Sequence, residues 1–314
     1  MWLTSLRRLI IRHFRSRATK YARPQHRRIP PRLDHLEDRT LLSSGGLPYA
    51  TPNTTAQLIA DINAANSAGG ATTITLASGA TFDFTAPYQA TNNALPVITG
   101  TITIEGNNAT LLRDSSASSA FRLFEVATGA TLTLQNLTLT GGLVTGSTAK
   151  GGAVYNSGGN LSMKSVVVAG NQAIGGVGQN AAGGGIYSSG GSLTLSHDVI
   201  GRTVKKSQTT KISLSTYTRT TKHSTKTIGA SNKAVSGTGG SAMGAGLYVT
   251  GGVVNVSSCT IAGNQLSGSL NAQGGGLYVS GVASLHLHND IVGRQSVQKI
   301  TLYPLGVTQT SQAT

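Results

Sequence analysis

The sequence predicts an all-β fold in which short coils stack into a parallel solenoid, and two observations support this prediction. Tetrads with apolar residues at alternate positions recur along most of the chain at a near-constant interval, and Gly, Asn or Ser bound them. A unit of about 30 residues without a helix buries its apolar face only when it stacks on its neighbours. The tetrads are TITL (73–76), TITI (101–104), TLTL (131–134), NLSM (160–163), SLTL (192–195), VVNV (253–256) and SLHL (284–287).

Each tetrad is predicted to be a strand. Alternation of apolar with Thr, Ser or Asn residues fits a pleat that sends successive side chains to opposite faces. One interval, from SLTL to VVNV, is close to twice the others. This interval predicts that one copy of the repeat is missing near residue 222, while the period itself survives.

One helix is predicted, over residues 54–69. Leu58, Ile62 and Ala65 stand at i, i+4 and i+7 of this segment and form an apolar stripe. The segment precedes the first tetrad, and a solenoid needs an atypical end unit to cover its core. We therefore expect the helix to be the N-terminal cap.

Two further patterns recur in phase with the tetrads. Glycine runs precede Ile186, Leu247 and Leu277, where they allow a tight corner with positive φ. AGNQ occurs at 169–172 and again at 262–265, an interval that equals three periods of the repeat and suggests a stacked ladder of Asn amides. Tyrosines are expected to stack along one face, as packing or as a carbohydrate-binding strip; they are Tyr155, Tyr187, Tyr248 and Tyr278.

The formal net charge of +15 comes from two segments. Residues 1–43 hold 11 Lys/Arg against 3 acids, and residues 202–235 hold 8 Lys/Arg and no acid. The remaining body is near neutral. The single cysteine, Cys259, excludes an intramolecular disulfide framework. No apolar run approaches the roughly 18 residues of a membrane span.

The basic leader, residues 1–43, is predicted to be disordered and lacks the apolar stretch of an ordinary secretory signal. Three interpretations stay open for it: an atypical export leader, a solvated arm, or an arm that binds nucleic acid. A misassigned start codon could also have added residues.

The second basic segment and the tail depart from the repeat at the same phase. Intact units have VVVAGNQ (166–172) and CTIAGNQ (259–265), whereas the departures begin at DVIGR (198–202) and DIVGR (290–294). One inserted G converts codons for Ala-Gly-Asn-Gln-Ser into codons for Gly-Arg-Gln-Ser-Val, the sequence at 293–297. We therefore expect 293–314, and through a compensated pair of shifts 202–235, to be out of frame. The alternative is a genuine basic loop that binds polyanions.

The sequence resembles right-handed parallel β-helix surface proteins, and more narrowly the polymorphic outer membrane protein-like repeat proteins of planctomycete bacteria. The resemblance covers residues 36–201 and 236–293, and LEDRTLLS (36–43) is similar to the N-terminal motif of exported proteins in that group. It implies a pectin-lyase-like solenoid over residues 44–314. It also implies a secreted protein located at the cell surface or outer membrane.

No catalytic constellation is predicted. From residue 151 onward the repeats contain two acids, Asp198 and Asp290, expected three coils and ~14 Å apart, too far to share one glycosidic bond. His286 and His288 could chelate a metal but lack an evident third ligand. We expect no local carboxylate pair among the earlier acids Asp61, Asp83, Glu105, Asp114 and Glu125; at most Glu105 and Asp114 approach each other within a coil.

The leading functional prediction is therefore an exported surface or envelope protein, structural or adhesive and without catalysis. No catalytic, cofactor-binding or metal-binding residue is assigned, no cofactor is expected, and no transmembrane segment is predicted. Cell-envelope polysaccharide or other surface proteins are the expected partners, and no specific nucleic acid. The alternatives are a polysaccharide-binding or polysaccharide-cleaving β-helix protein and a polyanion binder that uses the basic segments.

Overall fold

The computed structural model describes residues 47–205, 210–214, 217–221, 226–228, 230–268, 270–282 and 284–293. These residues form a parallel β-solenoid that a short helix precedes, which confirms the predicted fold class. The basic leader with LEDRTLLS and the tail from residue 294 lie outside the described residues.

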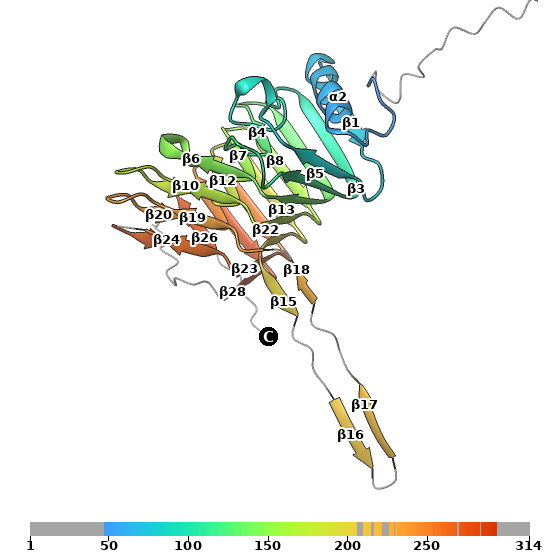
Figure 1. Ribbon diagram of the computed structural model, residues 1–314, viewed down its shortest axis with the longest axis vertical. Helices are drawn as coiled ribbons and strands as arrows, with labels where there is room; N and C mark the ends of the chain where they lie inside the picture. The colour runs from blue at the N-terminus through green and yellow to red at the C-terminus, as the bar shows by residue number, and fades with distance from the viewer. Residues whose placement is uncertain are drawn as a thin grey trace, which may run out of the picture. The chain divides into compact units, whose positions relative to one another are not determined.

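Helix α2 (Thr55–Ser67) begins where the hydroxyl of Thr54 accepts a hydrogen bond from the Gln57 amide. Its stripe, Leu58, Ile62 and Ala65, is buried in the main core, as predicted. The helix contacts β1, β2 and β3, the first strands of the stack (Figure 1). It covers the apolar interior that the first coil would otherwise expose.

A twelve-stranded parallel sheet forms two walls of every coil. The long strands β3 and β5 run along both walls, whereas later coils divide them into two strands. The first wall contains the predicted tetrads. The strands are β1 (Ala71–Thr75), β2 (Thr81–Phe84), β3 (Thr101–Arg113), β5 (Thr131–Thr140), β8 (Asn160–Lys164), β9 (Val167–Ala169), β13 (Ser192–Ser196), β14 (Val199–Gly201), β22 (Val253–Ser257), β23 (Thr260–Ala262), β27 (Ser284–His288) and β28 (Ile291–Gly293).

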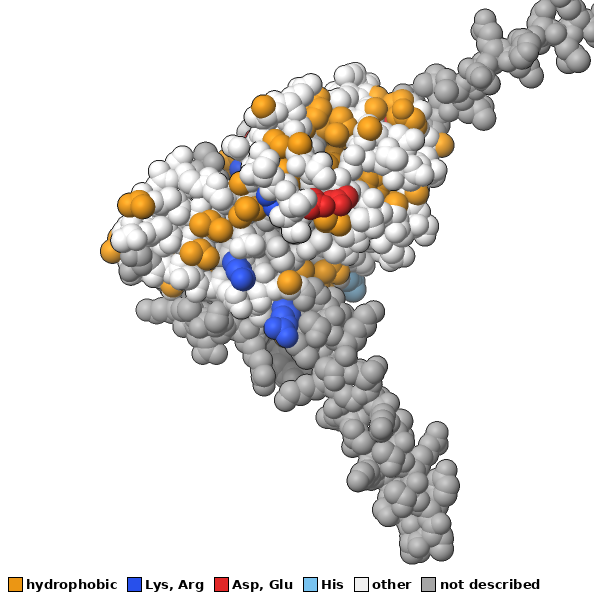
Figure 2. Space-filling view, viewed as in Figure 1, with side chains coloured by type: hydrophobic (Ala, Val, Ile, Leu, Met, Phe, Trp, Pro, Cys, Tyr) orange, Lys and Arg blue, Asp and Glu red, His pale blue; other side chains and the backbone are white. Residues whose placement is uncertain are grey.

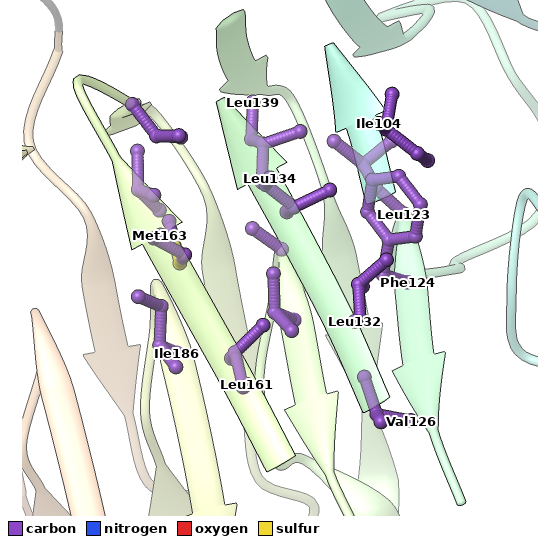
Figure 3. Packing of buried hydrophobic residues seen from close by; sticks show 14 of the residues in the cluster. Ile104, Leu123, Phe124, Val126, Leu132, Leu134, Leu139, Leu161, Met163 and Ile186 are labelled. Atoms are coloured by element: carbon purple, nitrogen blue, oxygen red, sulfur yellow. The ribbon is translucent and has the colours of Figure 1, made fainter. Parts of the chain in front are cut away.

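A five-stranded parallel sheet faces these walls and encloses the main core. Its strands are β4 (Phe124–Val126), β7 (Val154–Asn156), β12 (Ile186–Ser189), β21 (Leu247–Thr250) and β26 (Leu277–Ser280). Leu, Ile, Val and Phe side chains from successive coils interdigitate between the sheets, as Figure 3 shows for Leu132, Leu134, Leu161 and Met163. Inward residues lie in register from coil to coil, so each apolar side chain packs on its counterpart in the next coil.

Between the second wall and the five-stranded sheet, the chain makes an outward excursion that we call the lobe. An outgoing sheet, β6 (Leu143–Thr145), β10 (Gln172–Ile174), β19 (Lys233–Val235) and β24 (Gln265–Ser267), packs on a returning sheet. The returning strands are β11 (Ala181–Ala182), β20 (Ala242–Met243) and β25 (Ala272–Gln273). Figure 1 shows these strands to one side of the main sheets. A separate, alanine-rich cluster fills the lobe.

The predicted Asn ladder lies where the chain leaves the second wall for the lobe, and it has a third member. Asn171, Asn232 and Asn264 are fully buried. The Nδ2 of each of the first two donates to the Oδ1 of the next, at 3.1 Å in both cases. The Nδ2 of each of the three asparagines also donates to a backbone carbonyl of the second wall. The ladder therefore satisfies polar groups that would otherwise be buried without partners.

The glycine runs lie opposite this ladder. Gly183 has a φ of +63°, and the equivalent glycines before Leu247 and Leu277 also have positive φ, as predicted. At Gly184, a Cβ atom would clash with the carbonyl oxygen of Lys233. The runs thus allow the chain to turn and let the two walls of the lobe meet closely at its base.

The stack does not lack a coil at the place where the sequence lacks a copy of the repeat. Two distances between residues that were predicted by counting repeats are therefore wrong. Strand β13 pairs directly with β22 and β10 directly with β19, so a single coil takes up the whole double-length interval of the sequence. The AGNQ segments, like Asp198 and Asp290, are consequently two coils apart and not three. Counting by period failed because the extra residues leave the coil and return to it.

The extra residues contain four strands that pair only with one another. Strand β15 (Thr203–Lys205) pairs antiparallel with β18 (Lys226–Ile228), and β16 (Thr210–Leu214) pairs antiparallel with β17 (Tyr217–Thr221). Residues 230–235, part of the segment predicted to be irregular, instead continue the stack. The proposed reading-frame shift stays a prediction.

Candidate functional site

Asp198 and Asp290 occupy equivalent corners of the coils, each one residue after a non-glycine residue with positive φ. Asp198 accepts hydrogen bonds from the amides of Val166, 2.7 Å away on the preceding coil, and Ser196. Asp290 accepts from Cys259 and His288 in the same way. Both carboxylates therefore join neighbouring coils through backbone amides.

Burial raises the pKa of Asp198 to about 7, because its desolvation outweighs the two amide hydrogen bonds. Burial also raises the pKa of the Cys259 thiol to about 12; its Sγ lies 3.4 Å from the Asp198 amide nitrogen. A thiol with a raised pKa remains protonated at neutral pH and is a poor nucleophile. The burial of Asp198 and Cys259 therefore favours a structural role for this corner.

Among the earlier acids, Asp83 and Asp114 do form a local pair, contrary to the sequence-based expectation. Their side chains share a hydrogen bond, and the pairing of β2 with β3 brings them together. Burial, this hydrogen bond and repulsion by Asp114 raise the pKa of Asp83, whereas hydrogen bonds from Ser116 lower that of Asp114. Hydrogen-bonded carboxyls are closer than the ~5 Å or more between the catalytic pair of a glycoside hydrolase.

The two histidines of β27 extend from one face of the strand. Within the described ranges, no three His, Cys, Asp or Glu side chains gather closely enough to hold a metal ion. Across the same part of the chain, no helix has the length and hydropathy to span a bilayer.

The outward side chains of the first wall form a regular array that we call the hydroxyl face. One column of it runs across seven strands, and every member except the last is a hydroxyl or an amide. Inward neighbours such as Ile102 and Leu132 are buried and fix the backbone beneath it. The column is Thr73, Thr103, Thr133, Ser162, Thr194, Asn255 and His286.

The tyrosines stack as predicted. Ring centroids of Tyr187, Tyr248 and Tyr278 are 4.9 and 5.0 Å apart with nearly parallel planes, and Tyr155 is tilted against Tyr187 at 5.4 Å. Because neighbouring rings cover each other's faces, and Tyr187 and Tyr278 are buried, little ring face is exposed to solvent. A carbohydrate-binding aromatic strip needs exposed ring faces, so this geometry favours the packing interpretation.

Two cations that the sequence reasoning missed flank the tyrosine row. Arg122 lies over the Tyr155 ring at 4.9 Å and is paired with Glu125 at 2.9 Å. The Lys150 ammonium lies 5.2 Å from the centroid of Tyr187. Lys150 directly precedes a glycine run, and this position beside the repeated Gly-Gly-x-x-Tyr pattern is the signal that could have identified it.

Lys150 and two of the tyrosines line a hollow of about 410 Å³ between the row and the returning strands of the lobe, which we call the lateral groove. One wall of the groove follows from the strand register, because Lys150 pairs with Ala182 and Ala182 pairs with Met243 on three successive coils. The groove is lined by Ser147, Ala149, Lys150, Gly178, Gln179, Asn180, Ala182, Tyr187, Met243 and Tyr248.

The stacked coils, the hydroxyl face and the lateral groove define a parallel β-solenoid repeat protein. No protein-family model, curated protein or solved structure significantly matches the chain. The resemblance to planctomycete outer-membrane-type repeat proteins therefore stays a prediction.

Proposed function

We propose that this protein is an exported, non-catalytic surface protein whose hydroxyl face adheres to cell-envelope polysaccharide. The regular column of hydroxyl and amide groups is the observation that carries the proposal. Adjacent strands set these groups about 4.8 Å apart, so they form a periodic set of hydrogen-bonding sites. Threonine is stiff at χ1, which limits the entropy lost when its hydroxyl is ordered.

The composition of the molecular surface supports the same function. Uncharged side chains dominate the face in Figure 2, where charged ones are scattered. A hydrogen bond that replaces one with water contributes little net free energy. Adhesion through such a face consequently needs many repeated contacts, which a solenoid supplies.

Co-sedimentation with insoluble envelope polysaccharide tests the proposal. The double variant Thr103→Lys/Thr133→Lys places two charges on the hydroxyl face, which already contains Lys164, and should weaken binding at least fivefold, or about 1 kcal/mol. Thr81→Lys, at an exposed position on the second wall, is the matched control and should bind like the wild type. Equal binding by all three proteins would contradict the proposal.

Two additional measurements separate the alternative functions. Release of reducing or unsaturated sugar ends during the incubation would favour the polysaccharide-cleaving alternative. Binding that falls steeply with added salt would favour the polyanion binder. Labelling of intact cells of the source organism with a membrane-impermeant reagent tests the surface location.

A further inference from the structure

The lateral groove is a concave surface separate from the hydroxyl face. None of the residues that line it belongs to the first wall, and they come from three successive coils. Its volume of about 410 Å³ lies within the range of ligand sites in proteins, roughly 300–1,000 Å³. The groove is large enough for a ligand of one or two sugar rings.

The groove is positively charged. Lys150 lines it, no Asp or Glu does, and the single ion pair within the described ranges joins Arg122 to Glu125 elsewhere. Contact with the Tyr187 ring holds the exposed ammonium in place without neutralising it. An uncompensated ammonium at the edge of a hollow favours an anionic group on the ligand.

The arrangement of the tyrosines disfavours a flat aromatic ligand. Tyr187 is covered by Lys150 and by Tyr248, and Tyr248 stacks between Tyr187 and Tyr278. No ring face remains open for a nucleobase or another flat aromatic group. Burial raises the pKa of Tyr187 to about 12 and that of Tyr248 above its usual value, so both hydroxyls stay protonated and can donate hydrogen bonds.

The rest of the lining offers hydrogen-bonding groups. Asn180 uses its Oδ1 to accept from the Ser241 amide at 2.7 Å, which leaves its NH₂ group for a ligand. Gln179 and Ser147 add an amide and a hydroxyl to the lining. Such donors and acceptors match a polyhydroxylated molecule.

We propose that the lateral groove binds a small polyhydroxylated anion, a sugar unit that carries one carboxylate or phosphate. Lys150 binds the anionic group. The side chains of Gln179 and Asn180 and the hydroxyls of Tyr187 and Tyr248 bind the sugar hydroxyls. No covalent step is involved.

Isothermal titration of the full chain with four probes tests this proposal: glucuronate, glucose 6-phosphate, glucose and inorganic phosphate. We expect at least one sugar anion to bind about tenfold more tightly than glucose and more tightly than phosphate alone. A preference between the two sugar anions shows whether the groove selects a carboxylate or a phosphate. Equal affinity for glucose, affinity for phosphate equal to that for glucose 6-phosphate, or no binding of any probe would overturn the proposal.

Matched variants assign the binding to the groove. Lys150→Ala should weaken the preferred sugar anion about tenfold, whereas Lys150→Arg should retain most of the affinity. Lys164→Ala, at an exposed position outside the lateral groove, is the control for lost charge and should leave the affinity of the groove for the sugar anion unchanged. A loss with Lys164→Ala equal to that with Lys150→Ala would overturn the assignment. This outcome would leave the proposed adhesion through the hydroxyl face untouched, because the co-sedimentation test uses neither variant.

Discussion

The two apolar clusters of this solenoid differ in the size of their side chains. The main core contains Phe82, Phe121 and Phe124 with many Leu and Ile residues. In the lobe cluster six of the eight buried residues are alanines, and Val144 and Leu266 are the others. Alanine allows two sheets to approach closely but buries little apolar area. The lobe must therefore rely more on backbone pairing and on the Asn ladder at its base.

The main core and the lobe should therefore differ in how well they tolerate substitutions. The main core gains stability from large interlocking side chains, which fix the spacing of its walls. The lobe is thin, and its returning strands are two residues long. The lateral groove lies beside the lobe, which is the region that the apolar core constrains least.

The greatest loss of stability should follow from truncating a side chain of the main core. Leu134→Ala removes a fully buried side chain and should lower the free energy of unfolding by about 3–5 kcal/mol. Ala173→Gly in the lobe should cost only about 1–2 kcal/mol, from one lost methyl group and added backbone freedom. Urea denaturation of both variants measures the difference. Equal losses would mean that the lobe core is as important as the main core.

A pH-dependent effect concerns the corner of the main core. The pKa of Asp198 is about 7 in the folded chain and 3.8 as a free group. Between these values the folded state holds a proton that the unfolded state has released, so stability falls as pH rises from about 4 to 7. The fall should be about 3–4 kcal/mol.

Asp198→Asn should remove most of that slope. Asp61, whose pKa burial raises to about 6, contributes a smaller fall of the same sign, and Asp61→Asn should remove that part. Thermal unfolding at several pH values between 4 and 8 measures both. An unchanged slope in Asp198→Asn would show that this carboxyl does not titrate as its burial requires.

The Asn ladder joins the two regions, and breaking it should have an intermediate effect. Asn232→Ala leaves the buried amide of Asn171 without its 3.1 Å acceptor and should cost about 2–3 kcal/mol. Asn255→Ala, on the hydroxyl face, should change stability by less than about 0.5 kcal/mol. Native-state hydrogen exchange should show the lobe opening before the main core in Asn232→Ala. Global loss without such local opening would contradict the role of the ladder.

The smallest effect is expected from shortening the long coil. Lys205 and Lys226 are antiparallel partners, and a two-residue Asn-Gly turn can join such strands. Replacing residues 206–225 by Asn-Gly should therefore change the free energy of unfolding by less than about 0.5 kcal/mol. A loss above about 1 kcal/mol would show that the removed residues support the coils. Heparin binding by both forms would show how much of any polyanion affinity this segment supplies.

The sequence predicted those features that repeat at a fixed phase. The strand tetrads, the helix stripe of Leu58 and Ile62, the tyrosine row and the Asn ladder all follow from periodicity. Asn232 escaped notice because Lys and Thr residues around it hide its relation to Asn171. Periodicity also cannot distinguish a missing coil from one long coil with extra residues, since both leave the later repeats in phase.

The candidate site was harder to predict because it depends on register between coils. Asp83 and Asp114 are separated by a slightly longer stretch of chain than the starts of the two tetrads next to them, TITL and TITI. Asp83 lies opposite Leu112, two residues before Asp114, so the two carboxyls meet diagonally across the strand pair and not at one phase of the repeat. The strands behind the lateral groove are too short to show alternation. Lys150 has no repeated counterpart, so pattern analysis gave it no weight.

The tyrosine row provides an intrinsic optical reporter of coil docking. The sole tryptophan, Trp2, lies outside the described residues, while three tyrosine rings are nearly parallel with centroids 4.9 and 5.0 Å apart. Transition dipoles at that separation couple, and the resulting near-ultraviolet circular dichroism depends on the angle and distance between neighbouring coils. Unzipping of the stack can thus be followed without a label, and Tyr248→Phe, which alters the central chromophore, identifies the signal.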